Sequence, residues 1–470
     1  MRIAWTSSCV AALALTLSAC ARTDVPPPHP GLPVPSRWAE TAAVPLSLDL
    51  TQYWRLLDDP LLTQFVEQAL GGNQDIAQSV ARLAQARAQL RGARANFLPQ
   101  ITGSGRGQQD IGSGSSGRPL ISLGADASWE ADMFGRIGSS VAASRADLAS
   151  AGYSLGDVQR AIVGQVALST ISARSIAAQL AIARDTLAYQ DQNLQIARWR
   201  VQAGLVSSLD VEQARSQRAQ TAATIPQLES SLASTANAIS TLIGEPPGRA
   251  LQALQPAARV PVPPEMAGFE APAQVLRRRP DVRAAEATLV ADAARIQGAK
   301  AQLLPLVQLG GSINTSSLGL GTLFNLITGN LFGTVSQLIF DGGRTRAQIQ
   351  GAEATAQGAL AAWRQSILGA LEDVETAAVQ LAKARERVTL YGEALDAANN
   401  SALLARNEYQ AGLTDFQNLL TSENQLLAAR NAQVAAEADR ASAFVRLTQA
   451  LGGGWAPTEY PLPIRDGTTS

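Results

Sequence analysis

The chain has 470 residues, of which 46% are hydrophobic but only 5% are aromatic. Alanine and aliphatic side chains therefore supply most of the apolar content, which suits close-packed helices better than a bulky globular core. The formal net charge is -1, and the longest basic run is Arg277-Arg278-Arg279. Nucleic-acid binding usually requires a clustered basic surface, so no nucleic-acid partner is expected.

The first 19 residues resemble a processing signal rather than a structural element. Arg2 gives a short positive region, residues 10–17 are apolar, and Leu17-Ser18-Ala19-Cys20 follows. This tetrapeptide resembles a bacterial lipobox, whose cysteine becomes the lipidated first residue of the mature protein. The alternative is an ordinary secretory signal with an incidental cysteine. Cleavage would remove Cys9 and leave Cys20 as the only cysteine, so no disulfide within one chain is expected.

Residues 20–55 are predicted to form a lipidated N-terminus followed by a tether. The run PPPHPGLPVPSRW at 26–38 is too rich in proline for a helix or a sheet and predicts an extended chain. It contains His29, the only histidine. No later segment offers the roughly 18 consecutive apolar residues of a membrane helix, so any membrane crossing would be made of strands.

Two similar segments indicate that the chain is built twice. The sequence RGARANFLPQI at 91–101 returns in similar form as QGAKAQLLPLV at 297–307, which is 206 residues later. Further along the offset becomes 208, so that Gly135-Arg136 matches Gly343-Arg344. A register kept over this length indicates a duplication. The predicted units are repeat 1 at 56–245, a proline-rich linker at 246–272, repeat 2 at 273–452 and a tail at 453–470.

A seven-residue spacing of apolar side chains predicts a long helix in each repeat. The spacing runs from Val166 to Val201 and again from Val374 to Tyr409, and it indicates helices that supercoil around neighbours. Without a proline, each segment predicts one helix roughly 100 Å long. Gly204 and Gly412 are expected to end these helices in a left-handed conformation. The predicted long and return helices are 136–203 with 208–243, and 344–411 with 416–451.

A β-hairpin is predicted in each repeat where the sequence alternates between apolar and polar residues. In the segment 120–134, Asp126, Glu130 and Asp132 share one face and apolar side chains share the other. A packed core would not accept three carboxylates on one face, whereas a strand between lipid and water would, so these residues are the candidate lumen face of a barrel. The hairpins are predicted at about 99–134 and 305–341, with turns at 110–118 and 316–330; the registers of strands 99–107 and 331–341 stay open.

These elements predict an α+β membrane protein with a long coiled-coil α-helical shaft, which the resemblance described below closes into a barrel, and a transmembrane antiparallel β-barrel. Four strands cannot close a barrel, because the smallest membrane barrels have about eight. Open edges in lipid leave unpaired amides that cost several kcal/mol each. The chain is therefore expected to oligomerise to complete the wall. This inference depends on strands that span a membrane, and edge strands in water would not require it.

Several short motifs stand in a characteristic order along the chain. They are Leu17 to Cys20, Trp54-Arg55 with Asp59-Pro60-Leu61, Trp129-Glu130 before Phe134-Gly135-Arg136, Arg278 to Arg283, Phe340-Asp341-Gly342-Gly343-Arg344 and Leu451-Gly452-Gly453-Gly454-Trp455. In this order they resemble the TolC family of outer-membrane efflux ducts, in its OprM/NodT-like lipoprotein branch, and the likeness covers essentially the whole mature chain. Without the family, the motif from Arg278 to Arg283 indicates a helix start with Pro280 at the first position and solvated arginines around it.

The resemblance implies a homotrimer, with four strands per chain closing a twelve-stranded barrel above a periplasmic tunnel of helices. It implies a lipid-anchored protein in the outer membrane of a Gram-negative bacterium, and Ala21 after the cysteine favours this sorting. It also implies two protein partners, a periplasmic adaptor protein and an inner-membrane pump of the RND type. The linker at 246–272 and the two termini would form a belt around the shaft.

Family members narrow at the periplasmic tip, where acidic side chains surround the axis. The resemblance places Asp210 at a gate position in repeat 1, with Glu212 and Arg215 beside it. Repeat 2 departs from the family, because Asn418 to Thr421 stand where an Asp-Val-Leu-Asp pattern is common. Nearby carboxylates could substitute, so a second acidic ring stays open, and a plain solvated tip is the alternative. The candidate gate residues are Asp210, Glu212, Arg215, Asp415, Asn418, Thr421 and Glu423.

Enzyme chemistry finds no support, and no cofactor is expected. With His29 in a tether and Cys20 lipidated, histidine-based triads and histidine or thiolate metal sites are unavailable. The pair Asp58-Asp59 and the pair Glu372-Asp373 are expected to be solvated on helix surfaces or turns.

Two classes of function remain. The first is a passive export duct for small amphiphilic compounds, and type I protein secretion is a variant of it. The second is a non-porous structural or adaptor coiled coil that spans the envelope. The polar strand face of Asp126, Glu130 and Asp132 favours the duct, because a non-porous adaptor needs no wet lumen.

Overall fold

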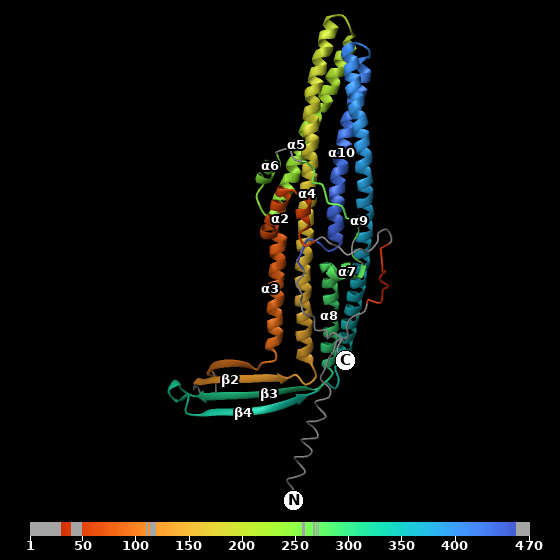
Figure 1. Ribbon diagram of the computed structural model, residues 1–470. Helices are drawn as coiled ribbons and strands as arrows, with labels where there is room; N and C mark the ends of the chain where they lie inside the picture. The colour runs from red at the N-terminus through yellow and green to blue at the C-terminus, as the bar shows by residue number, and fades with distance from the viewer. Residues whose placement is uncertain are drawn as a thin grey trace.

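The computed structural model describes residues 30–38, 49–109, 111–112, 119–255, 259–266, 268, 270 and 272–456. Cys20, the lipobox and His29 lie outside the described residues, as does the tail from 457 onward. The described chain forms a long rod of helices with a small sheet projecting from one end (Figure 1). The mostly helical architecture with one antiparallel sheet agrees with the predicted class.

The helices and strands follow the predicted order closely. The largest departures are an earlier last strand and additional short helices near the middle of the rod. The elements are η1 (Tyr53–Leu57), α2 (Pro60–Gly72), α3 (Gln74–Ala95), β1 (Gln100–Gln109), β2 (Pro119–Ala131), α4 (Arg136–Gln202), α5 (Ser208–Ile243), α6 (Arg249–Leu254), α7 (Pro272–Arg278), α8 (Pro280–Ala301), β3 (Leu306–Ser317), η2 (Leu320–Thr322), β4 (Ile327–Ser336), α9 (Arg344–Ala411) and α10 (Phe416–Ala450).

The two long helices, α4 and α9, have 67 and 68 residues, so each is roughly 100 Å long. Both end as predicted at a glycine with positive φ, +66° at Gly204 and +76° at Gly412. The next residue then donates its backbone N–H back to the helix, from Leu205 to Arg200 and from Leu413 to Glu408. This left-handed cap reverses the chain, so α5 and α10 return along the helices that precede them (Figure 1).

The C-terminal ends of the return helices abut the N-terminal ends of α3 and α8. At the first junction, the side-chain amide of Asn73 donates to the carbonyl of Leu242 at 2.8 Å. At the second, the guanidinium of Arg279 donates to the carbonyl of Ala450 at 3.2 Å. Each contact satisfies a helix-end carbonyl that has no partner within its own helix. A short helix and a return helix therefore form one nearly continuous helical column.

Arg279 corrects the expectation of solvated arginines around the start of α8. Pro280 does occupy the first helical position, but Arg279 is only 3% exposed. Its guanidinium pairs with Asp281 at 2.6 Å and with Asp373 at 2.9 Å. The residue is buried because the junction between α8 and α10 needs a donor that reaches the Ala450 carbonyl.

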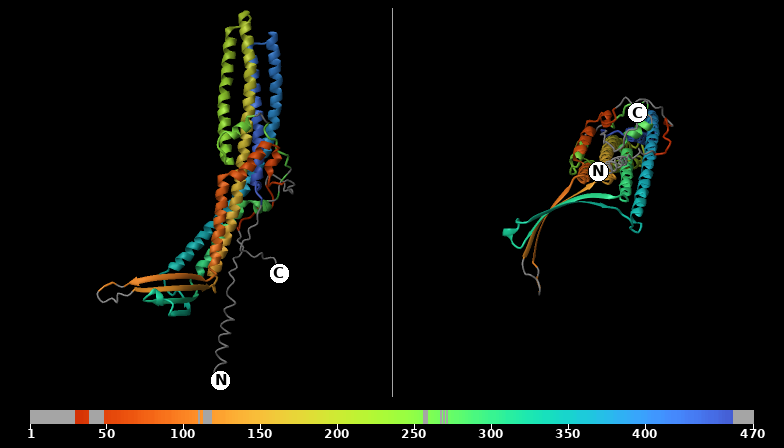
Figure 2. Two further views of the ribbon diagram at one scale, coloured as in Figure 1. Left: turned by 90° about the vertical axis from the view of Figure 1, so that its left-hand side faces the viewer. Right: turned by 90° about the horizontal axis from the view of Figure 1, so that it is seen from below.

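The four strands form one antiparallel sheet in the order β1-β2-β3-β4. Residues that lie opposite one another on neighbouring strands point to the same face of such a sheet. Here apolar side chains lie opposite apolar side chains. Trp129 faces Leu309, and Ala125 faces Ile313. On the other face Glu130 lies opposite Gln308. The register thus gives the whole sheet one mainly apolar and one mainly polar face, and Figure 2 shows it as a curved strip beside the helices.

The second hairpin corrects the predicted strand at 331–341. β4 begins earlier, at Ile327, and ends at Ser336, so part of the expected turn is strand. Leu331 and Phe332 are adjacent and both apolar, so the sequence does not show which of the two side chains lies on the apolar face of the sheet. Pairing decides it, because Phe332 lies opposite Gly310, where the absent side chain leaves room for the ring. A Cβ at Gly310 would stand 2.5 Å from a ring carbon of Phe332.

The predicted linker at 246–272 contains α6 and the first residue of α7, and it attaches to the two halves of the shaft differently. Against α4 and α5 the contact is apolar, with Leu251 of α6 packed against the buried cluster that contains Leu180 and Leu232. Against α9 and α10 it is ionic, with Glu265 paired to Arg385 at 3.2 Å and to Arg440 at 2.9 Å. Salt therefore screens the second attachment but not the first.

The main core is built by residues of η1, α2, α4, α5, α6, α9 and α10, at mid-height of the molecule, where α2 and α6 lie in Figure 1. Tyr53, Leu62 and Phe444 are almost completely buried there. One stretch of α4 has the mean hydropathy and length of a membrane span, but 61% of it is buried inside the protein. Packing against neighbouring helices accounts for this apolar stretch.

Candidate functional site

The two helical turns lie side by side at the end of the rod far from the sheet (Figures 1 and 2). A small apolar cluster ties them together behind the turns, separate from the main core. It is built by α4, α5, α9 and α10, and its buried members are Leu194, Ala214, Ala405, Tyr409, Phe416 and Leu419. This cluster holds the two hairpins at a fixed spacing.

Arg200, near the end of α4, links the two hairpins directly. Its guanidinium donates to the backbone carbonyls of Tyr409 at 2.8 Å and Gln410 at 3.1 Å, close to the end of α9. The guanidinium carbon also lies 4.4 Å from the centre of the Tyr409 ring. Cations at a helix C-terminus are favoured by the helix dipole, so Arg200 fastens one turn to the other.

Asp210, in the first turn of α5, is half-buried between the hairpins. Burial, and next the negative charge of Asp415, raise the pKa of the Asp210 carboxyl, while Arg200 acts in the opposite direction. Asp415 caps α10 by accepting the backbone N–H of Asn418 at 2.8 Å. The structure therefore brings Asp210 and Asp415, one from each turn, within electrostatic reach of one another.

The remaining candidate gate residues do not converge on these two carboxylates. Glu212 and Arg215 pair loosely at 3.8 Å on an exposed surface. Asn418 donates to the Thr414 hydroxyl at 3.0 Å. Thr421 donates to the carbonyl of its own helix at Gln417, at 2.8 Å.

Glu423 is not available as a free tip carboxylate. Its side chain is only 11% exposed and pairs with Arg406 at 3.3 Å. Both of its oxygens also accept from the Asn193 amide at 2.9 Å. Glu423 therefore joins α10 to α4 and α9 within the shaft wall, two turns away from the tip.

Sequence reasoning missed Arg200 and assigned Tyr409 only to the heptad pattern. A basic residue in the last turn of α4 is a recognised cap signal, but nothing local shows that the carbonyls it reaches belong to another helix. Tyr409 is 2% exposed, and its ring packs edge-on against Phe416 at 5.6 Å. Both contacts arise from the pairing of the two hairpins.

The three candidate lumen residues separate in the structure. Asp126 stays on the polar face, opposite Ser312. Glu130 shares that face but holds Arg136 through a hydrogen bond from Nε at 2.7 Å. Asp132 lies beyond the end of β2 and accepts the backbone N–H groups of Ile137 and Gly138 at 3.0 and 2.7 Å. Its placement on the strand was wrong, because the free amides at the start of α4 bind it instead.

Comparison with known proteins decides the family. The sequence matches the Outer membrane efflux protein family over residues 65–245 and 271–453. The chain belongs to this family. Members of this family are channel components of efflux systems, and the family is not one of enzymes. The protein is therefore an outer-membrane protein that acts in efflux.

Relatives of this efflux protein match it over nearly its whole length. Pyoverdine export outer membrane protein OpmQ of Pseudomonas aeruginosa is 30% identical, over 96% of this chain and 98% of its own. Nodulation protein T of Rhizobium leguminosarum bv. trifolii is 29% identical, over 91% and 93%. Among solved structures, the outer-membrane channel OprN is 31% identical with a TM-score of 0.83, over 92% of this chain and 100% of its own.

Proposed function

We propose that this efflux protein is a passive duct that carries small amphiphilic compounds across the outer membrane as a homotrimer. The observation that carries the proposal is the sheet, which has an apolar face, a polar face and two edge strands, β1 and β4, exposed along their whole length. Such edges are not stable in lipid. Pairing β4 of one chain with β1 of the next closes a ring of three chains with lipid outside and water inside.

The duplication supports a closed helical wall below this barrel. Asn73 and Arg279 occupy matching positions in the two repeats, as do Leu242 and Ala450. Each pair makes the same contact between a short helix and a return helix. The family also matches two separate segments of the chain. Two similar units per chain would give a trimeric tunnel six similar wall sectors.

The partners in this proposal are a periplasmic adaptor protein and an inner-membrane pump of the RND type, with the chain anchored to outer-membrane lipid at Cys20. The support is the family and the efflux roles printed in its relatives' names, such as pyoverdine export for OpmQ. A non-porous adaptor is less well supported, because it would not need the polar face around Asp126.

The test combines assembly with conductance. Purified protein in detergent is expected to contain three copies by light scattering and to form ion-conducting pores in planar bilayers. Leu331→Arg, on the apolar face, should cost about 2–4 kcal/mol in the membrane and reduce trimer yield. The neighbouring Asn330→Arg, on the polar face, should assemble normally. A strictly monomeric protein, or equal yields from the two variants, would reject the proposal.

We further propose that Asp210 lines the narrow periplasmic end of the duct. Asp210→Ala is expected to raise single-channel conductance, because it removes a half-buried side chain and its attraction to Arg200 from between the two turns. Glu212→Ala is the matched control, since Glu212 is exposed and forms only a loose 3.8 Å pair with the equally exposed Arg215. Planar-bilayer recording of both variants decides: unchanged conductance in Asp210→Ala excludes Asp210 from the gate.

A further inference from the structure

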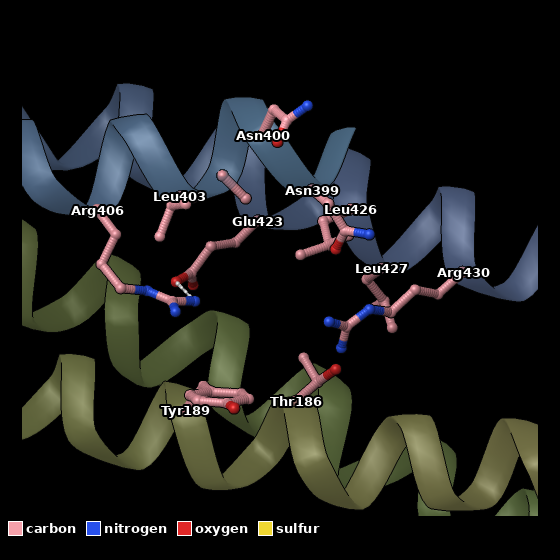
Figure 3. A pocket seen from close by; sticks show the side chains of 11 residues that line it. Thr186, Tyr189, Asn399, Asn400, Leu403, Arg406, Glu423, Leu426, Leu427 and Arg430 are labelled. Carbon is pink, nitrogen blue, oxygen red and sulfur yellow. Dashed lines mark hydrogen bonds and ion pairs between the residues drawn. The ribbon is translucent and has the colours of Figure 1, made fainter. Parts of the chain in front are cut away.

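A cavity of about 290 Å³ lies in the shaft wall, on the tip side of the main core, between α4, α9 and α10. Figure 3 shows side chains from all three helices converging on it. Its apolar lining includes Leu403 and Leu427, and its polar lining includes two arginines, one carboxylate and the Thr186 hydroxyl. All of these residues lie on α4, α9 and α10.

At one end of the cavity the charges are balanced. Arg406 pairs with Glu423 at 3.3 Å, and its guanidinium carbon lies 5.0 Å from the centre of the Tyr189 ring. Glu423 is also held by the amide of Asn193. This end therefore offers a neutral ion pair above an aromatic ring, and both carboxylate oxygens already accept hydrogen bonds.

At the other end a positive charge is left uncompensated. Arg430 of α10 is half-buried, and Figure 3 shows its guanidinium extended into the cavity toward Thr186. Within the described part of the chain, no hydrogen bond or ion pair reaches this guanidinium. A half-buried cation is strongly stabilised by an anion that replaces its lost hydration.

The combination of one free guanidinium with an aromatic and aliphatic surface defines the ligand class. An inorganic anion would satisfy Arg430 but leave the leucines unused, and a neutral apolar molecule would do the reverse. We propose that this cavity binds a small amphiphilic anion, a single carboxylate or sulfonate on a compact apolar body. The anionic group pairs with Arg430, and the body lies on Leu403 and Leu427 beside the Tyr189 ring.

The site occurs once per chain. The position of repeat 1 that corresponds to Arg430 is Ala222, and the position that corresponds to Glu423 is Arg215. Neither the free cation nor the neutralised ion pair is therefore reproduced between the helices of repeat 1. The site is thus specific to the cavity between α4, α9 and α10, and the expected stoichiometry is one ligand per chain.

The test uses naphthalene-2-sulfonate as the probe, with the full-length protein in lipid nanodiscs and titration calorimetry against empty nanodiscs. We expect saturable binding of one probe per chain. Arg430→Gln should weaken it about tenfold or more, because a charge-assisted hydrogen bond is lost, and Arg430→Lys should retain part of it. Arg346→Gln, an exposed arginine of α9, is the matched control and should bind like the parent protein.

A neutral ligand separates charge recognition from apolar partition. Naphthalene-2-sulfonamide has the same body without the charge and is expected to bind about tenfold more weakly than the sulfonate. Thermal midpoints of the variants show whether they are folded. Equal binding by Arg430→Gln and the parent protein, equal affinity for the two ligands, or no saturable heat would each overturn the proposal. None of these results depends on whether the protein conducts.

Discussion

Replacing Gly244 with alanine is expected to cost about 2–5 kcal/mol, from backbone strain and overpacking together. Gly244 ends α5 at φ +75°, where an L side chain is strained. An added Cβ would also stand 2.2 Å from the carbonyl oxygen of Gly72. That oxygen is backbone at the junction of α2 and α3 and has no rotamer to change, so the helices must separate. The thermal midpoint of purified Gly244→Ala, followed by circular dichroism, measures the loss.

Gly204→Ala is the matched control for this prediction. Gly204 also lies at a helix end with positive φ, +66°, but nothing lies within 4 Å of an added Cβ. Alanine there should cost only the left-handed strain of about 1–2 kcal/mol. The difference between the two variants isolates the close approach of α5 to Gly72. Equal losses of stability in the two variants would show that this close approach does not hold the short helix and the return helix together.

Removing one partner of the Asp59–Arg174 pair is expected to destabilise the protein by about 3–5 kcal/mol. Asp59 begins α2 and Arg174 lies on α4, and their side chains are only 8% and 7% exposed. The guanidinium donates to both carboxylate oxygens, at 3.0 and 3.2 Å. Arg174→Met leaves a buried carboxylate without its counter-charge. Thermal unfolding of this variant measures the loss.

Two further variants show whether burial causes this effect. Asp59→Asn keeps a side chain that can cap α2, where Asp59 accepts from Leu61 at 2.9 Å, so its loss reports the ion pair rather than the cap. Glu67→Gln breaks the pair that Glu67 makes with Arg55, whose side chains are 55% and 56% exposed, and should cost at most about 1 kcal/mol. A midpoint for Arg174→Met no lower than that for Glu67→Gln would contradict the prediction.

Asp59 also shows where sequence reasoning failed. The sequence predicts that Asp58-Asp59 is solvated on a helix surface or turn. The interpretation was wrong for Asp59, which is 7% exposed. Its counter-charge is 115 residues away in sequence, and no local pattern connects the two. The same reason explains the error at Arg279 and the burial of Glu423, because their partners include residues of other helices.

The candidate site also combines features that local sequence patterns predicted with contacts between distant segments that they did not. The left-handed glycines at 204 and 412 placed both tip turns, and the resemblance pointed to Asp210. The contact of Arg200 with the Tyr409 carbonyl, and the approach of Asp415 to Asp210, exist only because the two hairpins are packed side by side. The cavity at Arg430 was not foreseen either, since its walls come from three helices.

The sequence by itself determined the elements of this protein, because their signals are local: a seven-residue apolar period for α4 and α9, proline and glycine at helix ends, and alternation in β2. These features act between residues a few positions apart. Only the tertiary structure decided the register of β4, the buried ion pairs, the grouping at the tip and the cavity. Each of these depends on which distant segments meet, and the free energy of such contacts appears only once packing has removed water from between them.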